Sequence, residues 1–253
     1  MKNKNYTLEV CADSVASAVA AQEGGADRIE LCSALVIGGL SPSYAMFREV
    51  KKQVDLPIRV LLRPRFGDFC YDDYEFQTLK EEVFAFREMG ADGVVIGILN
   101  PDGTLNIEQM KALVQCARPS RGNDMKITLH RAFDVCCNPY EALEQCIQLG
   151  VDTILTSGQK NSVWNGRDLL KELIGLSQGK IEILAGAGIN PDVIEQLIQY
   201  ADVTSFHMSG KRVIDSRMEF RREGVPMGIP GLSEYDIWMT DKELIQQAKC
   251  KLK

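Results

Sequence analysis

The stretch GGADRIEL at residues 24–31 contains the end of a helix, a turn and the start of a strand. Similar phrases recur as GADGVVIG at 90–97, GVDTILTSG at 150–158 and YADVTSFH at 200–207. Each time, a glycine or another small residue turns the chain, an aspartate follows and an apolar, largely β-branched run begins. This order is typical of a helix C-terminus that leads into a strand. The four copies therefore predict a chain that alternates helices and strands.

The alternation extends over most of the chain. Strands separated by single helices form parallel sheets, and connections of mostly thirty residues or fewer favour a closed (β/α)8 barrel over a doubly wound sheet. We therefore predict an α/β protein with one TIM-barrel domain over residues 1–253, a loop-rich extension at 208–240 and a final helix from about residue 241. The extension is expected either to close the barrel or to form a subunit interface. The eight strand candidates are 7–11, 28–32, 58–63, 93–98, 126–130, 153–157, 181–185 and 202–207.

The amino-acid composition limits which partners the protein is expected to bind. The 253 residues include 29 Lys and Arg against 35 Asp and Glu, a net charge of -6, which argues against nucleic acid as a partner. The start MKNKNYTLEV has no apolar core, and no apolar run is long enough for a membrane span. The eight cysteines are scattered without a C-x-x-C motif, which favours free thiols. These features predict a cytoplasmic protein that does not bind membranes.

Alternation along the strands predicts which side chains face the barrel interior. In LEVC, Leu8 and Val10 suit the face that helices cover, so Glu9 and Cys11 share the other face. A glutamate on the apolar face would be buried without a partner, at a cost of several kcal/mol. Further polar side chains gather at the carboxyl ends of the strands, where barrel enzymes carry their chemistry: Glu30, Arg63, His130 and His207.

Small and basic residues follow the strands at the same rim. Ser157 ends strand six, and the turn GAGIN at 186–190, which includes Gly186 and Gly188, offers backbone N–H groups before a helix that opens at Pro191. The segment SGKR, with Ser209 and Lys211, follows strand eight. Five basic residues around one mouth predict an anionic ligand, a phosphate or a carboxylate: Arg63, Arg65, Arg131, Lys211 and Arg212.

Several longer segments resemble one known family. The segments LEVCADSVASAVAAQEGGADRIELCSAL, GGLSPS, RPRFGDFCY, HRAFD, LTSG and SFHMSGKR are similar to the CutC family, historically named for copper homeostasis, from Leu8 to about Arg222. The resemblance implies a cytoplasmic TIM-barrel protein, usually an oligomer, that is reported to bind copper. The family's recurring positions correspond here to Glu9, Cys11, Glu30, Cys32, Arg63, Arg65, His130, Arg131, Asp134, Ser157 and His207.

Copper binding is the first functional hypothesis. Cys11 and Cys32 end two adjacent strands about 4.8 Å apart and offer two soft thiolates to Cu(I). The competing interpretation is that both cysteines are small buried hydrophobes. A third arrangement, a divalent metal held by Glu9, Glu30 and His130, uses a donor set without a recognised spacing.

The alternative is a TIM-barrel enzyme of unassigned reaction that acts on a small anionic metabolite. A carboxylate, Glu9 or Glu30, fixes the tautomer of His130 and raises its basicity, which makes an acid/base pair. The structural interpretation of the same residues is a buried network in which Asp134 pairs with Arg131 to brace the loop. The candidate catalytic residues are Glu9, Glu30, Arg63, His130, Arg131, Asp134 and His207. The candidate ligand-binding residues are Arg65, Ser157, Gly186, Gly188, Ser209 and Lys211.

Assembly is the last hypothesis. The tail from Lys211 to Asp241 is a candidate interface, so we expect a homo-oligomer, a dimer or larger. The sequence leaves open whether the protein is an enzyme.

Overall fold

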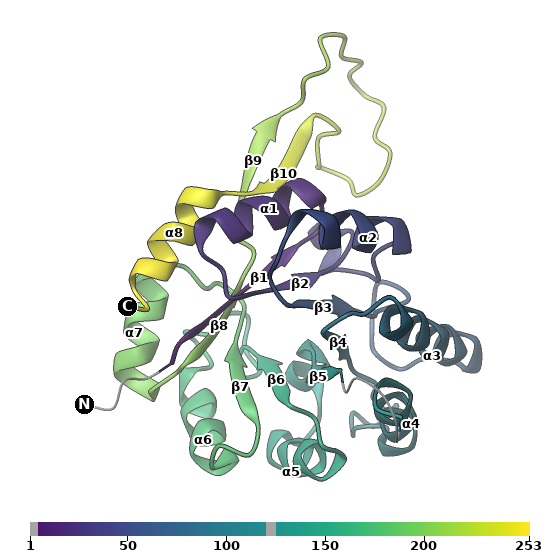
Figure 1. Cartoon of the computed structure of the whole chain (residues 1–253), viewed down its shortest axis with the longest axis vertical. Helices are drawn as coiled ribbons and strands as arrows, with labels where there is room; N and C mark the ends of the chain where they lie inside the picture. Colours follow the sequence, from purple (N-terminus) through teal and green to yellow (C-terminus); the bar gives the residue numbers. More distant parts are fainter. Residues whose placement is uncertain (1–4, 120–124) are drawn as a thin grey trace.

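The computed structural model describes residues 5–119 and 125–253. Residues 1–4, the start of MKNKNYTLEV, lie outside the described residues. Eight parallel strands form a closed barrel in sequence order (Figure 1). Pairing of β8 with β1 closes it, so the predicted TIM barrel is confirmed. The strands are β1 (Thr7–Ala12), β2 (Arg28–Leu31), β3 (Ile58–Leu61), β4 (Gly93–Ile96), β5 (Lys126–Leu129), β6 (Thr153–Thr156), β7 (Glu182–Ala185) and β8 (Ser205–Met208).

Helices surround the barrel, one after each strand. Most begin at a side chain that accepts hydrogen bonds from the first free backbone N–H groups, such as Asp72, which forms a capping box with Glu75. None of the helices in the described ranges is long and apolar enough to cross a membrane. The helices are α1 (Val15–Gly24), α2 (Tyr44–Gln53), α3 (Asp73–Glu88), α4 (Ile107–Ala117), α5 (Pro139–Leu149), α6 (Arg167–Ser177), α7 (Pro191–Ala201) and α8 (Lys242–Cys250), with short 3-10 turns η1 (Leu35–Ile37) and η2 (Arg131–Val135).

The aspartate of the repeated phrase connects neighbouring strands. In the first copy, Asp27 precedes β2 and accepts a hydrogen bond from the backbone N–H of Leu8 in β1 at 2.7 Å. The second and third copies repeat this contact: Ile58 N–H donates to Asp92 at 2.9 Å, and Ile127 N–H donates to Asp152 at 2.8 Å. Each aspartate therefore holds the amino end of its strand against the strand before it.

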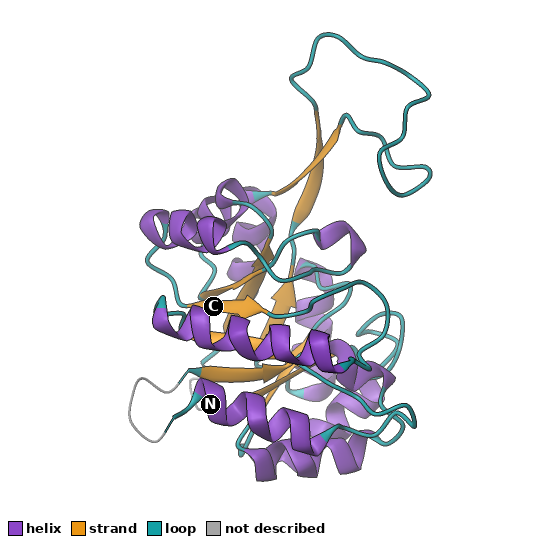
Figure 2. Ribbon diagram, turned by 90° about the vertical axis from the view of Figure 1, so that its right-hand side faces the viewer, coloured by secondary structure: helices purple, strands orange, loops and turns teal. Residues whose placement is uncertain are grey.

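A two-stranded antiparallel hairpin projects from the barrel between β8 and α8 (Figure 2). It consists of β9 (Lys211–Asp215) and β10 (Asp236–Thr240) with the loop between them, and we call residues 211–240 the arm. The loop-rich extension predicted at 208–240 also contains two paired strands, in which Lys211 pairs with Thr240 and Asp215 with Asp236. The arm does not close the barrel. The final helix begins at Lys242, close to its predicted start.

Candidate functional site

Charged side chains occupy much of the barrel interior, beside a small buried cluster of Cys32, Leu61 and Val95. Glu9 is fully buried, and Arg28 Nε donates to its Oε2 at 2.5 Å. Arg28 Nη1 also donates to Glu182 on the far strand β7 at 3.1 Å. Because this contact joins β2 to β7, the side chains cross the barrel interior. Arg59 lies 3.9 Å from Glu182 and donates to two threonine hydroxyls.

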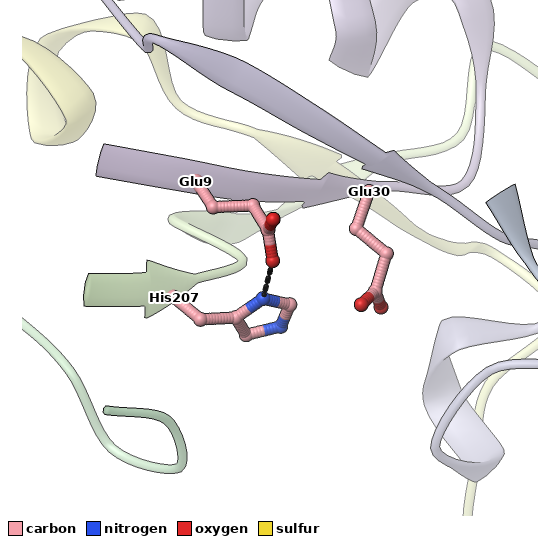
Figure 3. A group of neighbouring side chains, drawn as sticks. All are labelled: Glu9, Glu30 and His207. Carbon is pink, nitrogen blue, oxygen red and sulfur yellow. Dashed lines mark hydrogen bonds and ion pairs between the residues drawn. The ribbon is translucent and has the colours of Figure 1, made fainter. Parts of the chain in front are cut away.

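His207 is the histidine that joins this network. Its Nδ1 lies 2.7 Å from Oε1 of Glu9, and Figure 3 shows its ring between Glu9 and Glu30. The expected pairing of His130 with one of these glutamates was wrong, because His130 bonds instead to the backbone N–H of Ala132. The same finding corrects the metal hypothesis: the ligand atoms that lie within 4.8 Å of one another belong to Glu9, Glu30 and His207.

The pKa values of the titratable side chains in this cluster are shifted strongly. Burial by itself raises the pKa of Glu9, but the charge of Arg28 and the hydrogen bond and charge of His207 outweigh it and lower that pKa to about 2. Burial raises the pKa of Glu30 to about 7, against the attraction of His207. Burial opposes the charged imidazole of His207, yet Cys11 and Glu30 raise its pKa well above the usual value.

We interpret the cluster as an internal ion network rather than a metal centre. Both oxygens of Glu9 are already bonded, one to Arg28 and one to His207. Two arginines balance two carboxylates, Glu9 and Glu182, so a divalent cation would add uncompensated charge to a buried site. The Oε2 atom of Glu30 is the buried carboxylate oxygen of this group that accepts no hydrogen bond.

Cys11 and Cys32 lie at the carboxyl ends of β1 and β2, and both are buried free thiols. They are not directly opposite, because Cys11 pairs with Glu30 and Cys32 follows two residues later. Their Cα atoms are thus roughly 8 Å apart, judged from strand spacing and rise. Burial and the charge of Cys11 raise the pKa of Cys32 well above the usual value. Cys11 also hydrogen-bonds His207.

The loop after β5 is an internally braced structure. Asp134 accepts hydrogen bonds from Arg131 Nε at 2.7 Å and from the N–H and hydroxyl of Ser157 at 3.0 and 2.9 Å. Arg131 also reaches Ser157 Oγ at 3.1 Å. These contacts match the structural interpretation of Arg131 and Asp134 as a brace.

Most of the basic residues expected around the mouth already have internal partners. Arg65 contacts Glu75 at 2.5 Å and Asp68 at 2.8 Å. Lys211 lies over the Trp238 ring on the arm, 4.5 Å from its centroid, and Arg212 forms an ion pair with Asp241 at 3.3 Å. These contacts leave less unpaired positive charge than the sequence suggested, and Arg63 is the member without a carboxylate partner among the described residues.

The remaining candidate ligand-binding residues have structural roles. The carbonyl of Ser209 accepts from Thr240 at the base of the arm. Gly186 lies beside His207, since a Cβ there would be 3.7 Å from that side chain. Gly188 adopts a φ of 82°, which favours glycine. Asn190 caps two amides of α7, those of Asp192 and Val193, which follow the GAGIN turn. Within the turn, the Gly186 N–H donates to the carbonyl of Thr156 at 2.9 Å.

Sequence reasoning missed several residues that complete these sites. Alternation places Arg28 on the same face of its strand as Glu30 and Arg59 on the same face as Arg63, yet nothing in the sequence marks the two arginines as partners of the glutamates. Gly97 gave no signal: a Cβ there would lie 2.5 Å from Cε1 of His130, so only glycine admits that ring. The other missed residues are Phe69, Tyr71 and Glu182.

Comparisons with known proteins agree with the sequence resemblance. The CutC family model matches residues 6–212. A CutC family protein of Bacteroides fragilis is 44% identical over 237 residues, 92% of this chain and 92% of the relative. The human copper homeostasis protein cutC homolog is 41% identical over 237 residues, 93% of this chain and 85% of that protein. A solved CutC structure from Streptococcus agalactiae superimposes with a TM-score of 0.75 at 26% identity, covering 81% of this chain and 98% of that one.

Proposed function

Because the chain belongs to the CutC family, we propose that its part in copper homeostasis is to bind Cu(I) as cargo through Cys11 and Cys32. One observation carries the proposal: two buried thiols with no disulfide end adjacent strands on the inner face of the barrel. Soft thiolates are the ligands that Cu(I) prefers. The name of the human relative supports the choice of metal.

The raised pKa of Cys32 predicts how the affinity for Cu(I) depends on pH. The thiolate, not the thiol, binds the metal, and burial holds the Cys32 pKa well above its usual value. Binding must therefore release protons, so the apparent Cu(I) affinity should rise with pH. The offset of two residues separates the Cα atoms of the cysteines by roughly 8 Å, so their side chains must lean toward each other to share one ion.

The test is an anaerobic Cu(I) titration against a competing chelator. The double variant Cys11→Ser, Cys32→Ser should lose the tight site, whereas a matched control, Cys137→Ser with Cys250→Ser, should keep it because both control thiols are exposed. Repeating the wild-type titration at pH 6 and pH 8 should show tighter binding at pH 8. Equal affinity in wild type and the Cys11, Cys32 variant would refute the site.

We also propose that the arm associates with a second copy of the chain. Nine of the exposed large hydrophobic residues belong to it: Val213, Met218, Phe220, Val225, Met227, Ile229, Leu232, Ile237 and Trp238. A concentration of exposed apolar side chains on one projecting segment favours an interaction surface. The arm carries both arginines and glutamates, as a self-complementary two-fold contact needs.

Replacing residues 217–234 by a short turn should give a monomer by light scattering, if full-length protein is oligomeric. A full-length protein that is monomeric at high concentration would refute the proposal.

We also propose that the protein is cytoplasmic. Its eight unpaired cysteines support this location, because disulfides are rare in the cytosol.

A further inference from the structure

A second group of polar residues lies at the carboxyl end of the barrel, outside the ion network and the two thiols. Arg63 follows β3, His130 follows β5, and the ring of Phe69 lies against both. The Phe69 centroid is 4.9 Å from the Arg63 guanidinium carbon and 4.7 Å from the His130 ring centroid. Tyr71 follows Phe69 by two residues in the same loop, and its ring centroid is 5.4 Å from the guanidinium carbon of Arg65.

Arg63 is a buried cation without a counter-ion. It is only 8% exposed, and its Nη1 and Nη2 donate to the carbonyls of Gly39 and Gly67 at 3.3 and 2.6 Å. Its Nε has no acceptor, and no ion pair of the described residues includes it. A buried charge without a partner is costly, so the site favours an anion.

His130 is fixed as a neutral hydrogen-bond donor. Its Nδ1 accepts from the Ala132 N–H at 3.1 Å, so the proton of the neutral ring is on Nε2. Burial and the charge of Arg63 lower its pKa to about 3, so the ring stays neutral at physiological pH. Nε2 is buried and has no partner. This histidine therefore donates a hydrogen bond and does not serve as a general base.

Tyr71 supplies a third buried donor. Its hydroxyl has no partner, and burial raises its pKa to about 12, so it remains protonated. The Phe69 ring thus joins two donors, an N–H from Arg63 and an N–H from His130, and the same loop carries a third, the O–H of Tyr71. Its free positive charge is the single charge of Arg63, since Arg65 is neutralised by Asp68 and Glu75.

We propose that Arg63, His130 and Tyr71 form a binding site for the carboxylate of a small organic acid. A monocarboxylate brings one negative charge, which matches Arg63, and its two oxygens have enough lone pairs for three donors. A phosphate dianion would leave an uncompensated negative charge in a buried site. The site extends the function beyond copper and uses none of the proposed copper ligands.

The test is calorimetric titration of the full chain at pH 7 with formate, acetate and glycolate, and with inorganic phosphate as the competing class. Tyr71→Phe and His130→Phe each remove one donor and keep the ring. Tyr71→Phe removes a hydroxyl that has no partner in the ligand-free protein and should fold normally. His130→Phe also removes the Nδ1 acceptor of the Ala132 N–H, so its melting temperature is measured alongside binding. Each should weaken carboxylate binding about tenfold or more, the effect of losing a hydrogen bond to a charged group. The matched control is Tyr140→Phe, whose hydroxyl bonds Glu172 on the surface.

Three results would overturn the proposal. The first is a wild-type protein that binds no monocarboxylate more tightly than about 10 mM. The second is binding that is unchanged in both phenylalanine variants, which indicates an adventitious surface site. The third is a preference for phosphate over every carboxylate, which assigns the site to another class of ligand. Arg63→Gln provides a further check, since loss of the cation should abolish binding of all the anions.

Discussion

Glu9→Gln should be among the most destabilising isosteric substitutions in this barrel. The fully buried carboxylate bonds Arg28 at 2.5 Å and His207 at 2.7 Å. Removing one partner from such a pair leaves buried charge uncompensated and costs about 3–5 kcal/mol. The shift in the Glu9 pKa from 4.5 to about 2 gives a similar figure, about 3 kcal/mol. For a chain of this length, the melting temperature should fall by roughly 6–20 °C.

The dependence on pH provides an independent check. Because the folded pKa of Glu9 is lower than the unfolded one, its stabilisation is present above about pH 4.5 and is lost as the pH falls towards 2. The gap between wild type and Glu9→Gln, measured by urea unfolding, should therefore shrink over that range. The control is Glu49→Gln, which breaks a 2.6 Å pair with Lys52 on the surface and should cost less than about 1 kcal/mol. A Glu9→Gln variant within 1 kcal/mol of wild type at pH 7 would show that the network contributes little.

Three further substitutions test other parts of the barrel. Burial raises the folded pKa of Glu30 to about 7, so its contribution to stability decreases as the pH rises from 4.5 to 7. In urea unfolding, wild type should therefore lose stability relative to Glu30→Gln across that pH range. Parallel stability curves for the two proteins would contradict this. Gly97→Ala should cost about 1–3 kcal/mol, because the new methyl group would meet the His130 ring at 2.5 Å; an unchanged melting temperature would mean that the ring moves freely. Gly158→Ala should be more damaging, because the residue has a φ of 69° and its Cβ would overlap the carbonyl oxygen of Gly166; a folded protein of wild-type stability would refute the crowding.

The fold could be predicted from sequence because one local phrase marks the start of every second strand, β2, β4, β6 and β8. A glycine that ends a helix and an aspartate that bonds the previous strand are both encoded within a few residues. The strand pairing of the arm could not be predicted in this way, because the pairing of Lys211 with Thr240 spans a loop without a short hairpin turn signal.

The site was predicted only in part for a geometric reason. Alternation indicates which face of a strand a side chain occupies, and it brought Glu9, Glu30 and His207 to the interior. It does not give the register between strands, which decides partners. Glu9 pairs in register with His207 of β8, so that imidazole reaches the carboxylate while His130 lies across the mouth.

The aspartate contacts at the amino end of the barrel have a consequence for how such a chain can be divided. Asp27, Asp92 and Asp152 join β1 to β2, β3 to β4 and β5 to β6, so each bond stays within one two-strand segment. A cut between segments breaks none of these three bonds, whereas a cut inside one separates its partners. Split versions of the chain should therefore reassemble best when divided after α2 or α4, and segments exchanged between relatives should tolerate the same boundaries.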